Sequence, residues 1–197
     1  MSNILAYLFL KVQAITLLVF GRKLASLERF DAMLALAPSS RYVMASRAYL
    51  LGDLGDQHGA VDALVTLTRA HPENSAGWFN LGYMLADMGR HAEAEPAFRR
   101  AIRVEPKMDR AWYGLALVLI RDRRFDEAAE ALKKNTELQP MSPFGWYLLA
   151  RVHVDQQQPA QALRIIRHLH GFEPKVAAQL ERETGLFTAQ ALCTLKA

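Results

Sequence analysis

A period of 34 residues runs through most of the chain. One column at this spacing holds proline: Pro38, Pro72, Pro106, Pro140 and Pro174. A second column holds tryptophan: Trp78, Trp112 and Trp146. A fixed period of this length is typical of arrays in which each repeat is one supersecondary unit stacked on its neighbours. The period therefore predicts a tandem-repeat architecture.

Three further columns hold small residues. The first two contain Ala14, Ala48, Gly82, Ala116 and Ala150, and then Ser26, Ala60, Ala94, Ala128 and Ala162. Small side chains let two helices approach closely, where larger ones would hold them apart. The third contains Gly21, Gly55 and Gly89, which suit the left-handed conformation that ends a helix. Arg123 and Gln157 occupy this column in the last two units, so we expect those turns to be less relaxed.

The third unit reads Trp78-x2-Leu81-Gly82, then Ala94-x3-Phe98, then Pro106. This pattern resembles the tetratricopeptide repeat (TPR), a helix–turn–helix unit of 34 residues. The resemblance implies an all-α fold, a right-handed α-solenoid of such units. It divides the chain into five units, of which the first is degenerate: 7–40, 41–74, 75–108, 109–142 and 143–176.

The register predicts where each helix lies. First helices are expected near 6–20, 41–53, 75–88, 109–121 and 143–155. Second helices are expected near 24–36, 58–70, 92–104, 126–138 and 160–171. We therefore expect three parts: an apolar N-terminal helix with the degenerate first unit over 1–40, four units over 41–176, and capping helices over 177–197. The last part is interpreted as one helix ending near Gly185 and a shorter one ending near Cys193.

Residues 4–20 are apolar on every side apart from Lys11, Gln13 and Thr16. A helix that is apolar all round is usually buried in something. A membrane span would place Lys11 near its centre, and a signal peptide would lack its basic region. A helix on the membrane surface, with Arg22 and Lys23 near anionic headgroups, remains an alternative. The register favours a degenerate repeat covered by a partner or a second copy.

Composition argues against several functional classes. The net charge of +4, with 24 Lys and Arg against 20 Asp and Glu, argues against a nucleic-acid partner. A single cysteine excludes an internal disulfide or a cysteine-rich zinc site. We find no phosphate-binding loop, dinucleotide fingerprint or zinc-protease motif. We expect no catalytic residues, no metal site and no cofactor, and we interpret His153 as a packing histidine.

TPR arrays usually bind extended or helical segments along the concave surface lined by their first helices, and the resemblance implies the same here. The register assigns to this groove Tyr42, Tyr49, Phe79, Asn80, Tyr83, Arg110, Tyr113, Leu117, Arg121, Phe144, Tyr147 and Arg151. It also places Asp53 and Asp87 along the groove. In the first unit the apolar line continues through Leu8, Ile15 and Leu18. Aromatic rings supply contact area at little entropic cost, and arginines pair carboxylates.

One TPR subset clamps the C-terminal carboxylate of chaperones with Lys, Asn and Arg residues. Asn80 matches one of these positions, but aromatic residues and leucine replace the lysine and the second asparagine. The pattern disfavours that ligand. It favours an apolar or aromatic segment, with acidic residues near the fifth unit.

The sequence thus predicts a non-catalytic scaffold or assembly factor that binds another protein. The alternatives are a dedicated chaperone of an exported or membrane protein, and an accessory subunit of a larger membrane complex. We expect a cytoplasmic protein, with attachment to the inner membrane or homodimerisation through residues 4–20 as further alternatives.

Overall fold

The computed structural model describes residues 2–187, which form eleven α-helices and no strand. The first helices of the five pairs are α1 Ser2–Val19, α3 Arg41–Asp53, α5 Ser75–Asp87, α7 Asp109–Arg121 and α9 Pro143–Asp155. Their partners are α2 Lys23–Leu36, α4 Gln57–Ala70, α6 His91–Val104, α8 Phe125–Leu138 and α10 Pro159–His170. A further helix, α11 Pro174–Thr184, follows. The fold is all-α, as the periodicity predicts.

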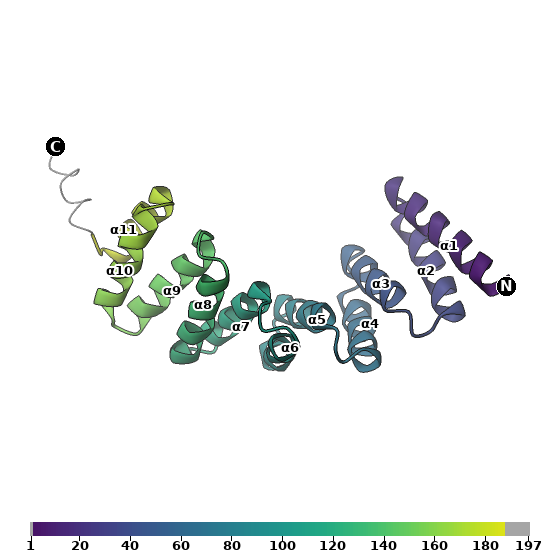
Figure 1. Ribbon diagram of the computed structural model, residues 1–197, viewed down its shortest axis with the longest axis horizontal. Helices are drawn as coiled ribbons and strands as arrows, with labels where there is room; N and C mark the ends of the chain where they lie inside the picture. Colours follow the sequence, from purple (N-terminus) through teal and green to yellow (C-terminus); the bar gives the residue numbers. More distant parts are fainter. Residues whose placement is uncertain (1, 188–197) are drawn as a thin grey trace. The chain divides into compact units, whose positions relative to one another are not determined.

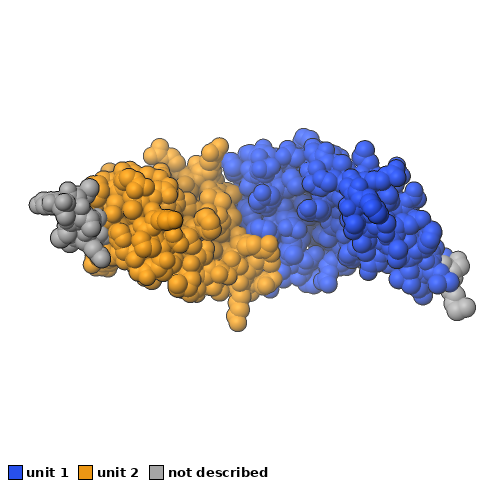
Figure 2. Space-filling model, turned by 90° about the horizontal axis from the view of Figure 1, so that it is seen from above, with its two compact units in different colours: residues 1–104 blue, residues 105–197 orange. Residues whose placement is uncertain are grey.

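Successive helices pack as antiparallel pairs joined by short turns (Figure 1). The pairs belong to two compact units, coloured separately in Figure 2. Unit 1 spans Met1–Val104 and contains α1 to α6. Unit 2 spans Glu105–Ala197 and contains α7 to α11. Every pocket and contact described below lies within one unit.

The two small-residue columns lie at the closest approach of paired helices. All members of the second-helix column, from Ser26 to Ala162, are fully buried. Gly82 shows why size matters, because a Cβ added there would lie 2.9 Å from the ring of Phe98. In the first repeat the two columns are also joined by a hydrogen bond of 2.9 Å from the Ser26 hydroxyl to the Ala14 carbonyl. The expected close packing is confirmed.

The proline and tryptophan columns are joined by a repeated hydrogen bond. The indole N–H of Trp78 donates to the carbonyl of Pro72 at 3.0 Å. The same bond recurs from Trp112 to Pro106 at 2.9 Å and from Trp146 to Pro140 at 2.8 Å. Each tryptophan is half-buried, so it packs with its ring and satisfies its polar atom. The two columns therefore tie the end of one repeat to the start of the next.

Turns within the pairs adopt the left-handed backbone that the glycine column predicts. Gly21, Gly55 and Gly89 have φ values of 70°, 87° and 74°. Arg123 and Gln157 adopt the same region, with φ of 58° and 59°. Side chains with a Cβ rarely occupy this region, so these two turns carry backbone strain.

The chain ends differ in detail from the sequence-based bounds. The first helix begins already at Ser2, and α11, after the fifth pair, begins at Pro174 and ends at Thr184. Gly185, with a φ of 70°, follows it in the left-handed conformation. The shorter helix expected to end near Cys193 lies outside the described residues. A cluster around Ala14, Phe30, Met33, Val43 and Leu50 anchors α1 on α2 and α3.

Candidate functional site

Unit 1 has a pocket between α3 and α5, which we call the tyrosine pocket. Its volume is about 560 Å³, within the ~300–1,000 Å³ typical of ligand sites. First helices supply most of its wall and α4 closes it. The lining residues are Ala45, Ala48, Tyr49, Gly52, Asp53, Gln57, Leu64, Phe79, Asn80, Tyr83, Met84 and Asp87. The structure therefore brings four of the predicted groove residues, Tyr49, Phe79, Asn80 and Tyr83, into one hollow.

Two tyrosine rings of the tyrosine pocket are open to solvent. Tyr49 is 71% exposed and Tyr83 is 60% exposed, although the rest of the repeat packs tightly. Phe79 is half-buried and contacts both Tyr83 and Phe98, with ring centroids 6.4 Å and 6.0 Å apart. Phe79 therefore braces the pocket, whereas the two tyrosines offer free surface to a ligand.

The tyrosine pocket carries acceptor groups at one end. Asp53 and Asp87 are the last residues of α3 and α5, and both line it. Asp53 forms an ion pair of 2.7 Å with Lys23, which raises the pKa of the lysine. Asp87 accepts a hydrogen bond of 3.0 Å from the amide of Gln57. The sequence register placed both aspartates here, but it did not assign Gln57 or Met84 to the groove.

Tyr42 lies on the first-helix face, but its ring packs between helices of the first two repeats. Its ring packs edge-on against Phe30, with centroids 6.1 Å apart. The ammonium of Lys11 lies 4.8 Å from the centre of the same ring. Tyr42 therefore links α1, α2 and α3, and it does not line the tyrosine pocket.

The first-helix face of unit 2 is built from α7 and α9. Phe144 and Leu117 are exposed there, as are Arg110, Arg121 and Arg151. Tyr113 is half-buried, and burial raises the pKa of its phenol. This face thus combines apolar side chains with arginines, whereas the tyrosine pocket combines aromatic rings with aspartates.

Two of the predicted groove residues in unit 2 bind a carboxylate of the same chain. The hydroxyl of Tyr147 donates to Glu183 on α11 at 2.6 Å, and Arg151 pairs with the same oxygen at 3.1 Å. The second Glu183 oxygen accepts from Gln179 at 2.8 Å. The hydrogen bond from Tyr147, followed by that from Gln179, lowers the pKa of Glu183. The helix α11 is therefore fastened to α9 through groove side chains.

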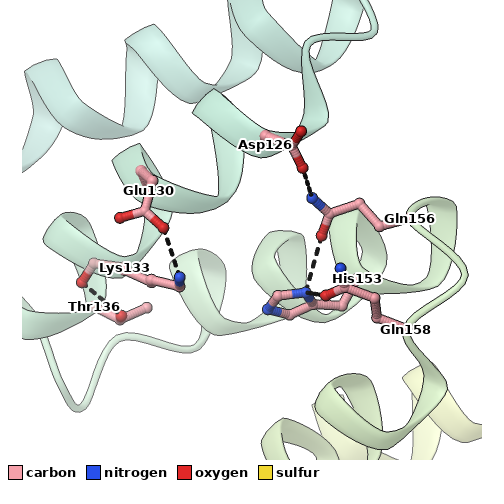
Figure 3. Close-up of polar contacts among 7 residues, drawn as sticks. All are labelled: Asp126, Glu130, Lys133, Thr136, His153, Gln156 and Gln158. Carbon is pink, nitrogen blue, oxygen red and sulfur yellow. Dashed lines mark hydrogen bonds and ion pairs between the residues drawn. The ribbon is translucent and has the colours of Figure 1, made fainter.

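His153 lies at the centre of a polar cluster between α8 and α9 (Figure 3). It is 8% exposed, and its Nδ1 lies 3.0 Å from the side-chain oxygens of both Gln156 and Gln158. Because both neighbours are acceptors, Nδ1 carries the proton. Gln156 in turn donates to Asp126 at 2.6 Å, which joins the two helices. Within residues 2–187 no group of three or more metal-ligating side chains comes together.

The predicted N-terminal interface is a largely uncovered surface of α1, which we call the α1 surface. Its residues are Ile4, Leu5, Leu8, Phe9, Val12, Ile15, Leu18 and Val19, all exposed by 36% or more. A continuous apolar surface of this kind usually marks a contact with another molecule. In the part of the chain that the structure describes, no helix is both long and apolar enough to traverse a bilayer.

Paired helices with a 34-residue repeat and a ligand-sized hollow between first helices define a helical-repeat protein of the interaction class. Tetratricopeptide repeat profiles match residues 45–103 and 85–143, and another matches residues 143–168. The chain belongs to the tetratricopeptide repeat family. No curated protein matches it in sequence.

Several solved structures have similar folds. MamA residues 41 to the end, from Desulfovibrio magneticus RS-1, gives a TM-score of 0.75 at 18% identity, covering 90% of this chain and 96% of its own. YrrB, described as a TPR protein with an unusual peptide-binding site, gives 0.73 at 19% identity, covering 86% and 88%. PilF from Pseudomonas aeruginosa gives 0.70 at 18% identity, covering 93% and 92%. At these identities the likeness concerns the fold.

Proposed function

We propose that the protein is a non-catalytic scaffold or assembly factor that binds a segment of a partner protein on its first helices. The observation that carries this proposal is the tyrosine pocket, where Tyr49 and Tyr83 are exposed above a tightly packed repeat. Large rings held by a rigid scaffold are the side chains that most often dominate binding energy in interfaces.

The chemistry of the first-helix faces supports a polypeptide ligand rich in apolar and aromatic side chains. The tyrosine pocket would hold one side chain of this segment. In unit 2, Phe144 and Leu117 would contact others, and Arg110 and Arg121 would pair acidic groups of the segment. YrrB, whose fold is similar, is described as having a peptide-binding site.

The test is affinity capture of partners from native cells by the full-length chain and by a Tyr49→Ala, Tyr83→Ala variant. We expect the double variant to bind the captured partner at least ~30-fold more weakly, because hot-spot residues contribute about 2 kcal/mol or more. Its helical circular dichroism should be unchanged, since both side chains are exposed. Met141→Ala, at an exposed turn residue outside the pocket, is the matched control. Equal affinity of the double variant and the wild type would refute the proposal.

A second double variant, Tyr83→Ala with Tyr113→Ala, extends the test to unit 2. We expect it to weaken binding by more than about 2 kcal/mol while the helical signal persists. Unchanged affinity would mean that the first-helix face is not the binding site.

Two more specific roles fit the same site: a dedicated chaperone of an exported or membrane protein, and a permanent subunit of a larger membrane complex. They differ in the behaviour of the isolated chain. A chaperone expressed alone should stay in solution, alone or as a dimer. A built-in subunit should aggregate or be degraded, since its interface would be uncovered.

We also propose that the α1 surface attaches the protein to a partner, a second copy or a membrane surface. Its support is the exposed apolar run from Ile4 to Val19, above an α1 whose Ala14 is fully buried in the first pair. The test compares wild type with a triple variant, Leu5→Gln, Phe9→Gln and Val12→Gln, by cell fractionation and by size in solution. These side chains are exposed, so the fold of unit 1 should persist.

We expect the wild type to sediment with membranes or in a larger assembly, and the triple variant to remain in the supernatant as a monomer. Removal of residues 1–20 should also end the attachment, but it uncovers Phe30 and Met33, so the triple variant is the decisive one. Met141→Gln changes an equally exposed apolar residue elsewhere and should behave as wild type. A wild-type chain found only as a free monomer in the supernatant would end all three forms of the attachment proposal.

A further inference from the structure

The same contact between neighbouring repeats occurs twice in unit 1, with different chemistry. In the first instance Lys23, the first residue of α2, pairs with Asp53, the last residue of α3, at 2.7 Å. In the second, 34 residues later, Gln57 donates to Asp87 at 3.0 Å. The cation of the first contact is thus replaced by an uncharged amide, while the aspartate is retained. The fold neutralises the charge of Asp53, and it offers Asp87 only a neutral donor in that contact.

The position of Asp87 in the fold also favours binding of a cation to its carboxylate. It is the last residue of α5, where the negative end of the helix dipole disfavours a carboxylate. It is exposed at the wall of the tyrosine pocket, in which no lining residue is lysine or arginine. A positive group entering the pocket would therefore gain an ion pair and would relieve an unfavourable local charge.

The other walls of the tyrosine pocket suit the same group. The exposed rings of Tyr49 and Tyr83 can hold a cation over their faces and an aliphatic stem along their edges. Asn80 is exposed beside them and provides an amide oxygen that accepts a hydrogen bond. An aromatic wall beside a carboxylate that accepts from a neutral amide is complementary to a long basic side chain, and not to an acidic one.

We infer that the tyrosine pocket takes a lysine or arginine side chain of the bound protein segment. This inference rests on the proposed function, in which the pocket holds part of a partner segment, and it specifies which part. It also makes the two first-helix faces differ in selectivity, because Arg121 in unit 2 occupies the column position of Asp87.

The experiment selects random dodecapeptides displayed on phage against the immobilised full-length protein. The strongest binder is then synthesised, together with an analogue that has norleucine at its most enriched basic position. Affinities of both peptides are measured by fluorescence anisotropy. We expect selection of a basic residue beside an aromatic or aliphatic one. We also expect norleucine to weaken binding to the wild type about tenfold, as loss of a charge-assisted bond should.

Three variants then assign the effect to Asp87. Asp87→Asn keeps an acceptor for Gln57 but removes the charge, and Gln57→Lys supplies the missing cation from within the chain, as Lys23 does for Asp53. In both, the difference between the two peptides should fall below about twofold. Gln57→Met removes the hydrogen bond without adding charge and should keep the tenfold difference. Asp155→Asn, at the end of α9 in the same column, is the control for a general loss of negative charge.

The inference is overturned if the selected peptides show no basic preference, or if the norleucine effect persists in Asp87→Asn and Gln57→Lys. The Tyr49→Ala, Tyr83→Ala variant then shows whether the proposed function is also wrong. If Tyr49→Ala, Tyr83→Ala still weakens the selected peptides, only the inference on the basic side chain is wrong. If this variant binds them as the wild type does, or if no peptide is selected at all, both are wrong.

Discussion

Individual side chains explain why the repeat columns have the composition they do. A Cβ at Gly82 would collide with Phe98, and each tryptophan has a bond to the proline carbonyl six residues before it. Each column therefore reflects a contact. The small-residue columns allow close approach of two helices, and the tryptophan and proline columns give the indole N–H a hydrogen-bond acceptor. Outside the five columns of the repeat pattern, the first helices differ from repeat to repeat: the position that holds Asp53, Asp87 and Asp155 in three repeats holds Arg121 in the fourth.

Backbone strain at Gln157 gives a prediction about stability. Its φ of 59° is a conformation that glycine adopts readily, and Gln157→Gly should raise the free energy of unfolding by about 0.5–1 kcal/mol. Urea denaturation measures the change. The reverse change, Gly89→Ala, should lower the free energy of unfolding by about 1 kcal/mol, because alanine is strained at a φ of 74°. Apart from the adjacent backbone, no atom of the described residues lies within 4 Å of the added Cβ, so this backbone strain is not mixed with a steric clash. A loss of stability in Gln157→Gly would show that the turn is not strained.

Much of the fold could be predicted from the sequence, because the period fixes the register of every helix. The second-helix column was expected to lie where paired helices approach closely, and its residues are fully buried. The turns at Arg123 and Gln157 have the expected left-handed conformation. The bond from tryptophan to proline was not predicted, although the constant six-residue offset between the two columns was a signal for it.

The candidate site was less predictable, because exposure and partners depend on neighbouring repeats. The register placed Tyr42, Tyr49 and Tyr147 on one face without distinguishing them. In the structure Tyr42 packs on Phe30, Tyr147 binds Glu183, and only Tyr49 remains mostly exposed. Contacts of this kind join residues more than ten positions apart. A comparison of equivalent positions in the repeats does not reveal them.

At the scale of helices, α11 is held by a carboxylate whose charge depends on pH. The hydrogen bond from Tyr147, then that from Gln179, lowers the pKa of Glu183 from its ordinary 4.5. A lowered folded-state pKa means that the stabilisation is complete above the unfolded pKa and is lost as the pH falls through the folded value. We therefore expect α11 to loosen as the pH falls below 4.5.

Amide hydrogen exchange of residues 174–184, corrected for the intrinsic effect of pH, measures this loosening. Tyr147→Phe removes the first cause of the lowered pKa, so its protection should depend less on pH in this range. Identical pH profiles for the variant and the wild type would show that the contact between Tyr147 and Glu183 does not fasten α11.

The α1 helix shows the opposite situation, an element that the rest of the chain covers only in part. Its inner side contributes Ala14 to the cluster around Phe30 and Met33, while residues such as Phe9 and Val19 stay exposed. In repeat arrays the outer face of a terminal unit is normally polar. The apolar residues here are the reason for proposing an attachment surface on α1 separate from the tyrosine pocket.

At the scale of the molecule, the first helices of unit 1 and the first helices of unit 2 present different chemistry. Unit 1 offers tyrosines with aspartates, and unit 2 offers Phe144 and Leu117 with arginines. A partner segment that contacts both should therefore carry basic and acidic residues in separate stretches. Binding should weaken with salt, because both sets of charges are near the surface.

The most direct test of the account is photo-crosslinking in native cells. A benzoylphenylalanine placed at Tyr83 lies in the tyrosine pocket, and one placed at Thr66 lies on exposed α4 surface outside it. We predict that the chain carrying the crosslinker at position 83 captures one specific protein, identified by mass spectrometry, and that position 66 does not. Capture of the same protein at position 66 alone, or of none at position 83, would contradict the claim that the tyrosine pocket is a binding site for a partner.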